Sequence, residues 1–169
     1  MSPLNPADVV AALADQLVAR GWMVATAESC TGGGIAAACT DRAGSSAWFD
    51  RGFVTYSNAA KQSMLGVPAE LIDAHGAVSE PVARAMAQGA LTHSAAAVSV
   101  AVTGIAGPGG AVPGKPVGTV WFAWALREGR LWSECCCFEG DRAAVRAATV
   151  VHALQRLVQG LADPDQAVV

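Results

Sequence analysis

ATAESCTGGGI, residues 25–35, is the stretch of the chain that decides its fold. Small apolar residues up to Ala27 predict a strand and the run from Gly33 predicts a helix, so the two elements meet at a short polar turn. Ser29 lies on this turn, and the glycines let backbone N–H groups approach a ligand closely. A helix N-terminus also attracts anions. The junction therefore offers either a serine nucleophile or a phosphate cradle, and turns of this kind are more often cradles.

Strand and helix patterns alternate along the rest of the chain. Asn5 and Pro6 open the first helix and Gly21 ends it. Helices are predicted at residues 6–20, 33–42, 58–65, 68–74, 80–93 and 141–158, and strands at 22–27, 51–56, 95–103, 117–126 and 131–138. A hairpin is expected at residues 127–130, and Val168 and Val169 are expected to end a short frayed tail. This order predicts an α/β fold, a three-layer α/β/α sandwich around a mixed sheet with a late antiparallel hairpin, in one domain over residues 1–169.

Composition narrows the class of protein. Hydrophobic residues make up 53% of the 169 residues and charged residues only 15%, which argues against disorder. The net charge of −3 gives no electrostatic reason to expect nucleic acid or a membrane as partner. No uncharged stretch is long and unbroken enough to cross a bilayer, and no signal peptide pattern is evident, so a cytoplasmic location is expected. The apolar excess predicts a homo-oligomer, most simply a two-fold dimer.

The cysteines do not form a disulfide framework or a CxxC metal site. There are five of them: Cys30, Cys39, Cys135, Cys136 and Cys137. Neighbouring strand residues point to opposite faces of a sheet, so the three adjacent cysteines cannot all reach one metal. They are interpreted as small hydrophobic residues in a strand, and Cys30 is a second, weaker candidate nucleophile. No cluster of metal ligands is evident, and neither a metal nor another cofactor is expected.

A serine nucleophile needs a base, because its hydroxyl is scarcely ionised at neutral pH. His75 lies in a loop and is a candidate base, although no neighbouring motif supplies an orienting carboxylate. His152 is expected to occupy a helix face. A Ser-His-Asp triad therefore has no motif to support it.

Lysine is the other candidate base, provided that burial or a neighbouring cation lowers its pKa. Lys61 and Lys115 are the only lysines in the chain. Lys61 lies one turn into a helix that follows a strand, so this junction can face the Ser29 turn. Tyr56, the only tyrosine, ends the same strand and can relay a proton to Lys61 or polarise it. Spacing alone favours a solvated helix lysine at position 61.

Two further segments can bind an anion. The loop after the buried strand begins Thr103-Gly104-Ile105-Ala106-Gly107, where open α/β sheets place their ligand crevice. Its backbone N–H groups can hold a phosphate or an oxyanion, although turn geometry alone also explains the glycines. Arg142 and Arg146 are four residues apart on one helical face and can hold a phosphate together, although surface arginines are usually solvated.

Together these segments resemble the CinA C-terminal domain family. The matching stretches run in order along most of the chain: AESCTGG at 27–33, AGSSAWFDRGFVTYSNAAK at 43–61, HGAVSEPVA at 75–83, TGIAGPGG at 103–110, KPVGTVWFA at 115–123 and GDRAAVR at 140–146. The resemblance implies deamidation of nicotinamide mononucleotide by a serine amidohydrolase. It also implies a Ser-Lys pair and a nearby tyrosine, which fall on Ser29, Lys61 and Tyr56.

The resemblance further implies a small-molecule nucleotide substrate and no cofactor. The residues expected to bind substrate, phosphate or oxyanion are Cys30, Thr31, Gly32, Gly33, Thr103, Gly104, Ala106, Gly107 and Arg142. One departure from the family pattern is Gly114, which replaces an acidic residue before the Lys-Pro-Val-Gly segment and affects contacts made by that loop. Two other functions stay open: a module that binds a pyridine mononucleotide without turnover, and a serine amidase for another small amide.

Overall fold

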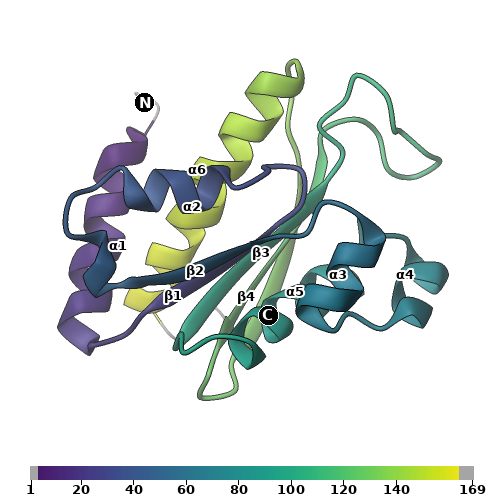
Figure 1. The fold of residues 1–169 in the computed structure, drawn as a ribbon. Helices are drawn as coiled ribbons and strands as arrows, with labels where there is room; N and C mark the ends of the chain where they lie inside the picture. The colour runs from purple at the N-terminus through teal and green to yellow at the C-terminus, as the bar shows by residue number, and fades with distance from the viewer. Residues whose placement is uncertain (1–3, 164–169) are drawn as a thin grey trace.

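A five-stranded sheet forms the centre of the molecule in the computed structural model, which describes residues 4–163 (Figure 1). Its strands are β1 (Val24–Glu28), β2 (Phe49–Val54), β3 (Val98–Gly104), β4 (Thr119–Leu126) and β5 (Leu131–Cys137), in the order β2-β1-β3-β4-β5. β2, β1 and β3 are parallel, whereas β4 and β5 are antiparallel to their neighbours. The predicted mixed sheet with a late hairpin is confirmed. The tail expected at Val168 and Val169 lies outside the described residues.

Helices cover both faces of this sheet. They are α1 (Pro6–Arg20), α2 (Gly34–Thr40), α3 (Asn58–Leu65), α4 (Ala69–His75), α5 (Glu80–Thr92) and α6 (Arg142–Ala162), with a short 3₁₀ helix at Ser45–Ala47. α1, α2 and α6 lie on one face and α3, α4 and α5 on the other (Figure 1). The predicted three-layer sandwich is therefore confirmed. No helix within residues 4–163 is long and apolar enough to cross a membrane.

The two faces of the sheet differ in the size of their side chains. On β4, Phe122 and Trp124 point toward α6, and their rings stack with centroids 5.7 Å apart. Ala123 and Ala125, which alternate with them, point toward α5. The small side chains let the α5 layer pack closely. At Gly89 of α5 a Cβ atom would lie only 2.1 Å from the carbonyl oxygen of a residue in α3, so glycine is required there.

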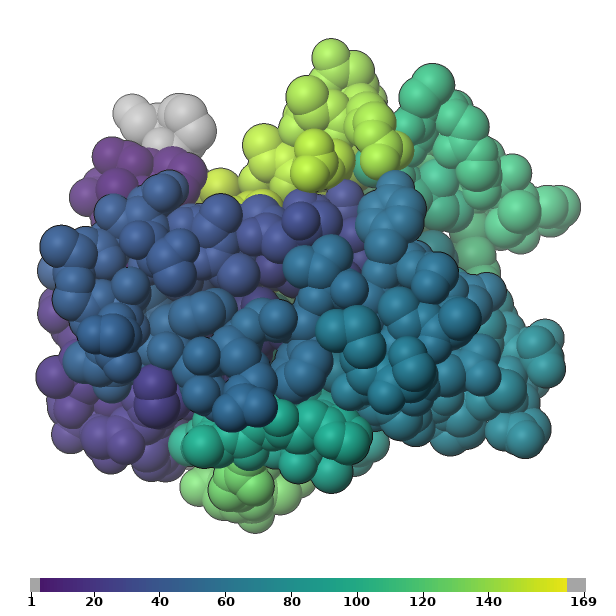
Figure 2. All heavy atoms as spheres, viewed as in Figure 1, coloured from purple at the N-terminus to yellow at the C-terminus, as the bar shows by residue number. Residues whose placement is uncertain are grey.

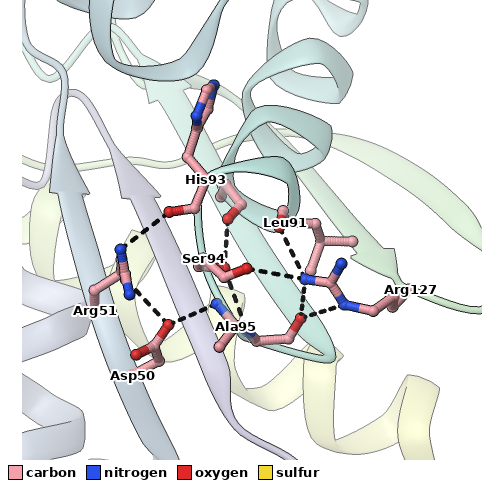
Figure 3. A network of polar contacts seen from close by, with 9 residues as sticks. Asp50, Arg51, Leu91, His93, Ser94, Ala95 and Arg127 are labelled. Carbon is pink, nitrogen blue, oxygen red and sulfur yellow. Dashed lines mark hydrogen bonds and ion pairs between the residues drawn. The ribbon is translucent and has the colours of Figure 1, made fainter.

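A polar network braces the amino ends of the parallel strands, opposite the edge where they end (Figure 3). Asp50 accepts hydrogen bonds from the Arg51 side chain and from the Ala95 backbone. Arg51 also donates to the carbonyl oxygen of His93. Arg127, just past β4, donates to carbonyl oxygens of Leu91, Ser94 and Ala96. The corner between α5 and β3 is thereby held by charged side chains from both sides.

The observed elements begin and end a few residues from the predicted positions, for local reasons. β1 begins at Val24 rather than at 22, because the N–H of Trp22 donates to Leu17 and closes the end of α1. β3 begins at Val98 rather than at 95, because Ala95 belongs to the braced corner. α6 continues to Ala162 rather than ending at 158, since its buried stripe continues through the last turn.

Candidate active site

Ser29 lies at the carboxyl end of β1, between the ends of β2 and β3. Its N–H donates to the carbonyl oxygen of Val102 (3.1 Å), and the carbonyl oxygen of Glu28 accepts from the N–H of Thr55 (2.8 Å). The turn is thus tied to both neighbouring strands. α2, which follows β1, covers one face of the sheet, whereas α3, which follows β2, covers the other. Adjacent strands whose helices leave on opposite faces open a crevice at their carboxyl ends, and Ser29 lies in it.

Lys61 reaches this serine from the first turns of α3. Its Nζ atom lies 3.1 Å from Oγ of Ser29 and donates to the carbonyl oxygens of Thr55 (2.9 Å) and Tyr56 (3.2 Å). Lys61 is only 1% exposed and Ser29 8%. The solvated helix lysine that spacing alone favoured is therefore wrong. The structure brings together the two residues that the resemblance pairs, although 32 positions separate them in the chain.

The surroundings of Lys61 favour a neutral amine. Burial lowers its pKa from the ordinary value of 10.5. Its three acceptors are a hydroxyl and two carbonyl oxygens, which carry no full negative charge to stabilise an ammonium. A neutral amine has two N–H bonds and one lone pair. The two N–H bonds can donate to the carbonyl oxygens of Thr55 and Tyr56. The lone pair can then accept a hydrogen bond from the hydroxyl of Ser29.

Glu28 is a buried acidic residue beside Ser29 that the sequence analysis did not single out. Its side chain is fully buried next to Ser29. The carboxylate accepts hydrogen bonds from the N–H groups of Ile35 (2.8 Å) and Ala36 (3.0 Å) and from the hydroxyl of Thr31 (2.6 Å). It therefore caps the N-terminus of α2 from inside the sheet. The sequence feature that could have identified Glu28 is an acidic residue at the end of a run of small strand residues, just before the glycine-rich start of a helix.

The anion that α2 attracts is thus the protein's own carboxylate. The N–H groups of Gly32 and Gly34 donate to carbonyl oxygens within the turn. Thr31 is buried and bound to Glu28. The N–H groups of Gly32, Gly34, Ile35 and Ala36 are therefore engaged inside the protein, and phosphate binding at this helix N-terminus stays a prediction.

A cavity of about 270 Å³ opens at Ser29. It includes most of the predicted site residues, namely Ser29, Cys30, Tyr56, Lys61, Thr103, Gly104, Ala106, Gly107 and Arg142. It does not include the expected Thr31, Gly32 and Gly33. Asn58, Ala77, Val78 and Ile105 also line it and had no expected role. The loop after β3 and the first turn of α6 lie side by side above this edge of the sheet (Figures 1 and 2).

The two arginines in the first two turns of α6 have different partners. Arg142 lies at the rim of the cavity, where it donates to the carbonyl oxygen of Gly107 (3.0 Å) and to the hydroxyl of Tyr56 (3.1 Å). Arg146 instead donates to the carbonyl oxygens of Cys30 and Thr31, both at 3.1 Å. Arg142 is therefore available to a ligand, whereas Arg146 holds the turn that carries Ser29. The phenol of Tyr56 is directed to Arg142, and only its backbone carbonyl contacts Lys61.

The rival nucleophile and base are poorly suited to these roles. Burial raises the pKa of the Cys30 thiol to about 11, so this cysteine is protonated at neutral pH. His75 does not line the cavity, and its carbonyl oxygen accepts a hydrogen bond from Lys115.

A possible metal-binding group lies elsewhere. Within residues 4–163 one set of three potential ligands has its ligand atoms within 4.8 Å of one another, namely Glu134, Cys136 and His152. The expectation that the sequence holds no such cluster is therefore wrong. Of the three adjacent cysteines, Cys136 packs against the core, whereas Cys135 and Cys137 are exposed. All three lie in β5, as expected, but only Cys136 packs as a hydrophobic residue.

Comparison with known proteins gives consistent matches over most of the chain. The family model described as the CinA C-terminal domain matches residues 7–161. The nicotinamide-nucleotide amidohydrolase PncC of Shigella flexneri is 59% identical over 145 residues, which cover 85% of this chain and 87% of that protein. The protein of the same name from Escherichia coli strain K12 is 57% identical over 143 residues, covering 85% and 87%.

Solved structures agree with these matches. The competence damage-inducible protein A from Klebsiella pneumoniae superposes with a TM-score of 0.91 at 45% identity, covering 94% of this chain and 98% of that one. The competence/damage inducible protein from Agrobacterium tumefaciens has a TM-score of 0.91 at 46% identity, covering 96% and 99%.

Proposed function

This chain belongs to the CinA C-terminal domain family, and we propose that it hydrolyses the carboxamide of nicotinamide mononucleotide to nicotinate mononucleotide and ammonia. Its relatives in Shigella and Escherichia are named nicotinamide-nucleotide amidohydrolases. The observation that carries the proposal is the 3.1 Å approach of the Lys61 amine to the Ser29 hydroxyl, inside a cavity at the carboxyl edge of the sheet.

In the acylation step Ser29 is the nucleophile and Lys61 the base. The Oγ proton moves to Nζ of Lys61 while a bond forms between Oγ and the carboxamide carbon. When the tetrahedral intermediate collapses, the C–N bond breaks and the Lys61 ammonium returns its proton to the departing nitrogen, which leaves as ammonia. Water then attacks the acyl carbon while Lys61 accepts a proton from it. The C–Oγ bond breaks, Lys61 returns the proton to Oγ of Ser29, and nicotinate mononucleotide leaves.

The oxyanion of the intermediate needs a backbone donor close to Ser29. We assign this role to the N–H of Cys30, because this residue follows the nucleophile and lines the cavity. The N–H of Gly32 is already bonded to the carbonyl oxygen of Ser29. Arg146 supports the turn from outside, since it binds the carbonyl oxygens of Cys30 and Thr31.

We assign the substrate phosphate to Arg142. Its guanidinium lies at the cavity rim and is held by a carbonyl oxygen and a phenol, neither of which neutralises its charge. It is also the first residue of α6, where the helix dipole favours an anion. The exposed ring of Tyr56 borders the same opening and positions Arg142. Tyr56→Phe is therefore expected to slow turnover less than a change at Lys61.

Arg142→Gln should raise KM for the mononucleotide with little change in kcat. Hydrogen bonds to charged groups contribute ~1.5–3 kcal/mol, so a KM increase of roughly tenfold or more is expected. Steady-state kinetics with the mononucleotide and with nicotinamide riboside check this, because the riboside has no phosphate and its KM should not move. Arg42→Gln, at an exposed arginine away from the cavity, is the matched control. An equal loss with both substrates would contradict the assignment.

Ammonia release from nicotinamide mononucleotide tests the function itself. The wild-type protein is expected to release ammonia and nicotinate mononucleotide in equal amounts, and Ser29→Ala should release none above background. Ser63→Ala, an exposed serine of α3, should behave as wild type. Circular dichroism establishes that each variant is folded.

Three outcomes separate the rival functions. Wild-type release no greater than that of folded Ser29→Ala would remove the proposal. Tight binding of the mononucleotide by calorimetry without ammonia would favour a regulatory binding module. Release from nicotinamide or its riboside at the same rate as from the mononucleotide would favour a serine amidase without a requirement for phosphate.

A further inference from the structure

β5 and α6 bring three metal-ligand side chains together outside the cavity. Glu134 and Cys136 are two residues apart on β5 and point to the same face of the sheet, toward His152 of α6. Cys135 and Cys137 alternate with them and are exposed on the other side. His152 lies ten residues after Arg142, about 15 Å along the helix, so this cluster is separate from the proposed amidase site.

The distances between the three ligand atoms fit a tetrahedral zinc ion. His152 Nε2 lies 3.0 Å from Glu134 Oε1 and 3.4 Å from Cys136 Sγ, and that sulfur lies 3.7 Å from Glu134 Oε1. Zinc bonds of ~2.0–2.3 Å at tetrahedral angles separate ligand atoms by ~3.3–3.6 Å. Shifts of a few tenths of an ångström would therefore complete the site, and no backbone movement is needed.

Neighbouring groups hold the ligands in this arrangement. Arg156 donates to Oε2 of Glu134 (2.9 Å), which fixes the carboxylate and leaves Oε1 directed at the other two ligands. The His152 ring packs against Phe122 and Phe138, with centroids 4.7 and 5.8 Å apart. Such outer contacts orient the ligands of metal sites. His152 also lines a surface cavity of about 360 Å³, whereas Glu134 and Cys136 do not.

We propose that Glu134 Oε1, Cys136 Sγ and His152 Nε2 bind a zinc ion that joins the edge strand β5 to α6. Zinc accepts this mixture of carboxylate, thiolate and imidazole. On binding, the Cys136 thiol proton is released to solvent, and His152 keeps its hydrogen on Nδ1 so that Nε2 coordinates. The thiolate and the carboxylate offset the two charges of the ion, while Arg156, which pairs with the same carboxylate, adds one positive charge.

Titration of the chelator-treated full-length protein with Co²⁺ alone tests the site, because a cobalt–thiolate bond gives a charge-transfer band. Wild type is expected to show this band at a 1:1 ratio, Zn²⁺ should abolish it by competition, and Zn²⁺ should raise the Tm. Cys136→Ser should lose the band and the Tm increase. The double variant Cys135→Ser/Cys137→Ser, which removes the two exposed thiols, should keep both.

His152→Gln keeps all three thiols and tests the site if Cys136→Ser does not fold. It should weaken Co²⁺ binding by more than the ~10–100-fold that an outer contact contributes. The proposal is wrong if wild type gives no thiolate band, if the band survives in Cys136→Ser, if the double variant abolishes it, or if His152→Gln binds Co²⁺ as wild type does. None of these readouts depends on amidase activity.

Discussion

Lys61→Met is expected to lower kcat by ~10²–10⁴-fold, the usual contribution of a general base. Methionine is apolar and has a similar length, so it suits a position that is 1% exposed. KM for nicotinamide mononucleotide should change little, because Lys61 contacts Ser29 and two carbonyl oxygens of its own chain. Steady-state ammonia release gives both constants.

Two experiments, the Lys61→Arg variant and rescue by added amines, distinguish a general base at position 61 from a residue that binds the substrate phosphate. Arginine keeps the charge but stays protonated, so turnover should remain as low as in Lys61→Met. Added primary amines should partly restore kcat in Lys61→Ala, where the truncated side chain leaves room next to Ser29. Retention of most of kcat in Lys61→Arg with a raised KM would overturn the assignment of Lys61 as base.

The lowered pKa of Lys61 also sets the sign of two pH dependences. The neutral amine is the active form, so kcat should rise with pH through this pKa and then level off. In the unfolded chain the amine binds a proton up to its ordinary pKa of 10.5. Between the two pKa values the unfolded state holds more protons than the folded state, so the free energy of unfolding should rise with pH. Lys61→Met should lack both effects, as rate and denaturation profiles would show.

The layers of this fold could be predicted because helix caps and hydrophobic periodicity are properties of short stretches of sequence. Asn5 accepts from the N–H of Ala7 and Gly21 ends α1 in a left-handed conformation, as the sequence indicated. The alternation of strands and helices, with one late hairpin, predicted the mixed sheet. The dimer expected from the apolar excess stays a prediction.

The site could be predicted only in part, because its contacts join distant segments. Helical spacing cannot tell a buried lysine from a solvated one, so the position of Lys61 next to Ser29 depends on how β2 and α3 pack. The cluster on β5 was missed because its third member, His152, lies on α6 and is far from Glu134 and Cys136 in the sequence. Glu28 was missed because a strand pattern does not reveal that the N-terminus of α2 lies within reach of a side chain at the end of β1.

Glu28→Gln is expected to lower the free energy of unfolding by ~1–4 kcal/mol. The carboxylate accepts from the N–H groups of Ile35 and Ala36 through separate oxygens. A glutamine offers one oxygen and one NH₂ group, so one buried N–H would face another donor, at ~1–3 kcal/mol. Loss of the negative charge at the N-terminus of α2 adds ~0.3–1 kcal/mol or more. Denaturant unfolding measures the sum, and Glu70→Gln, at the exposed first turn of α4, should change it by less than ~0.5 kcal/mol.

The same change should reduce turnover without touching the substrate. Glu28 holds the start of α2 and therefore the turn that carries Ser29, and a displacement of about 1 Å at a reacting group can reduce the rate ~100-fold. We expect kcat to fall ~10–100-fold at a temperature where circular dichroism shows the variant folded, whereas Glu70→Gln should leave it unchanged. A stability loss with full kcat would mean that Glu28 supports the fold alone and that Lys61 and Arg146 suffice to hold the nucleophile.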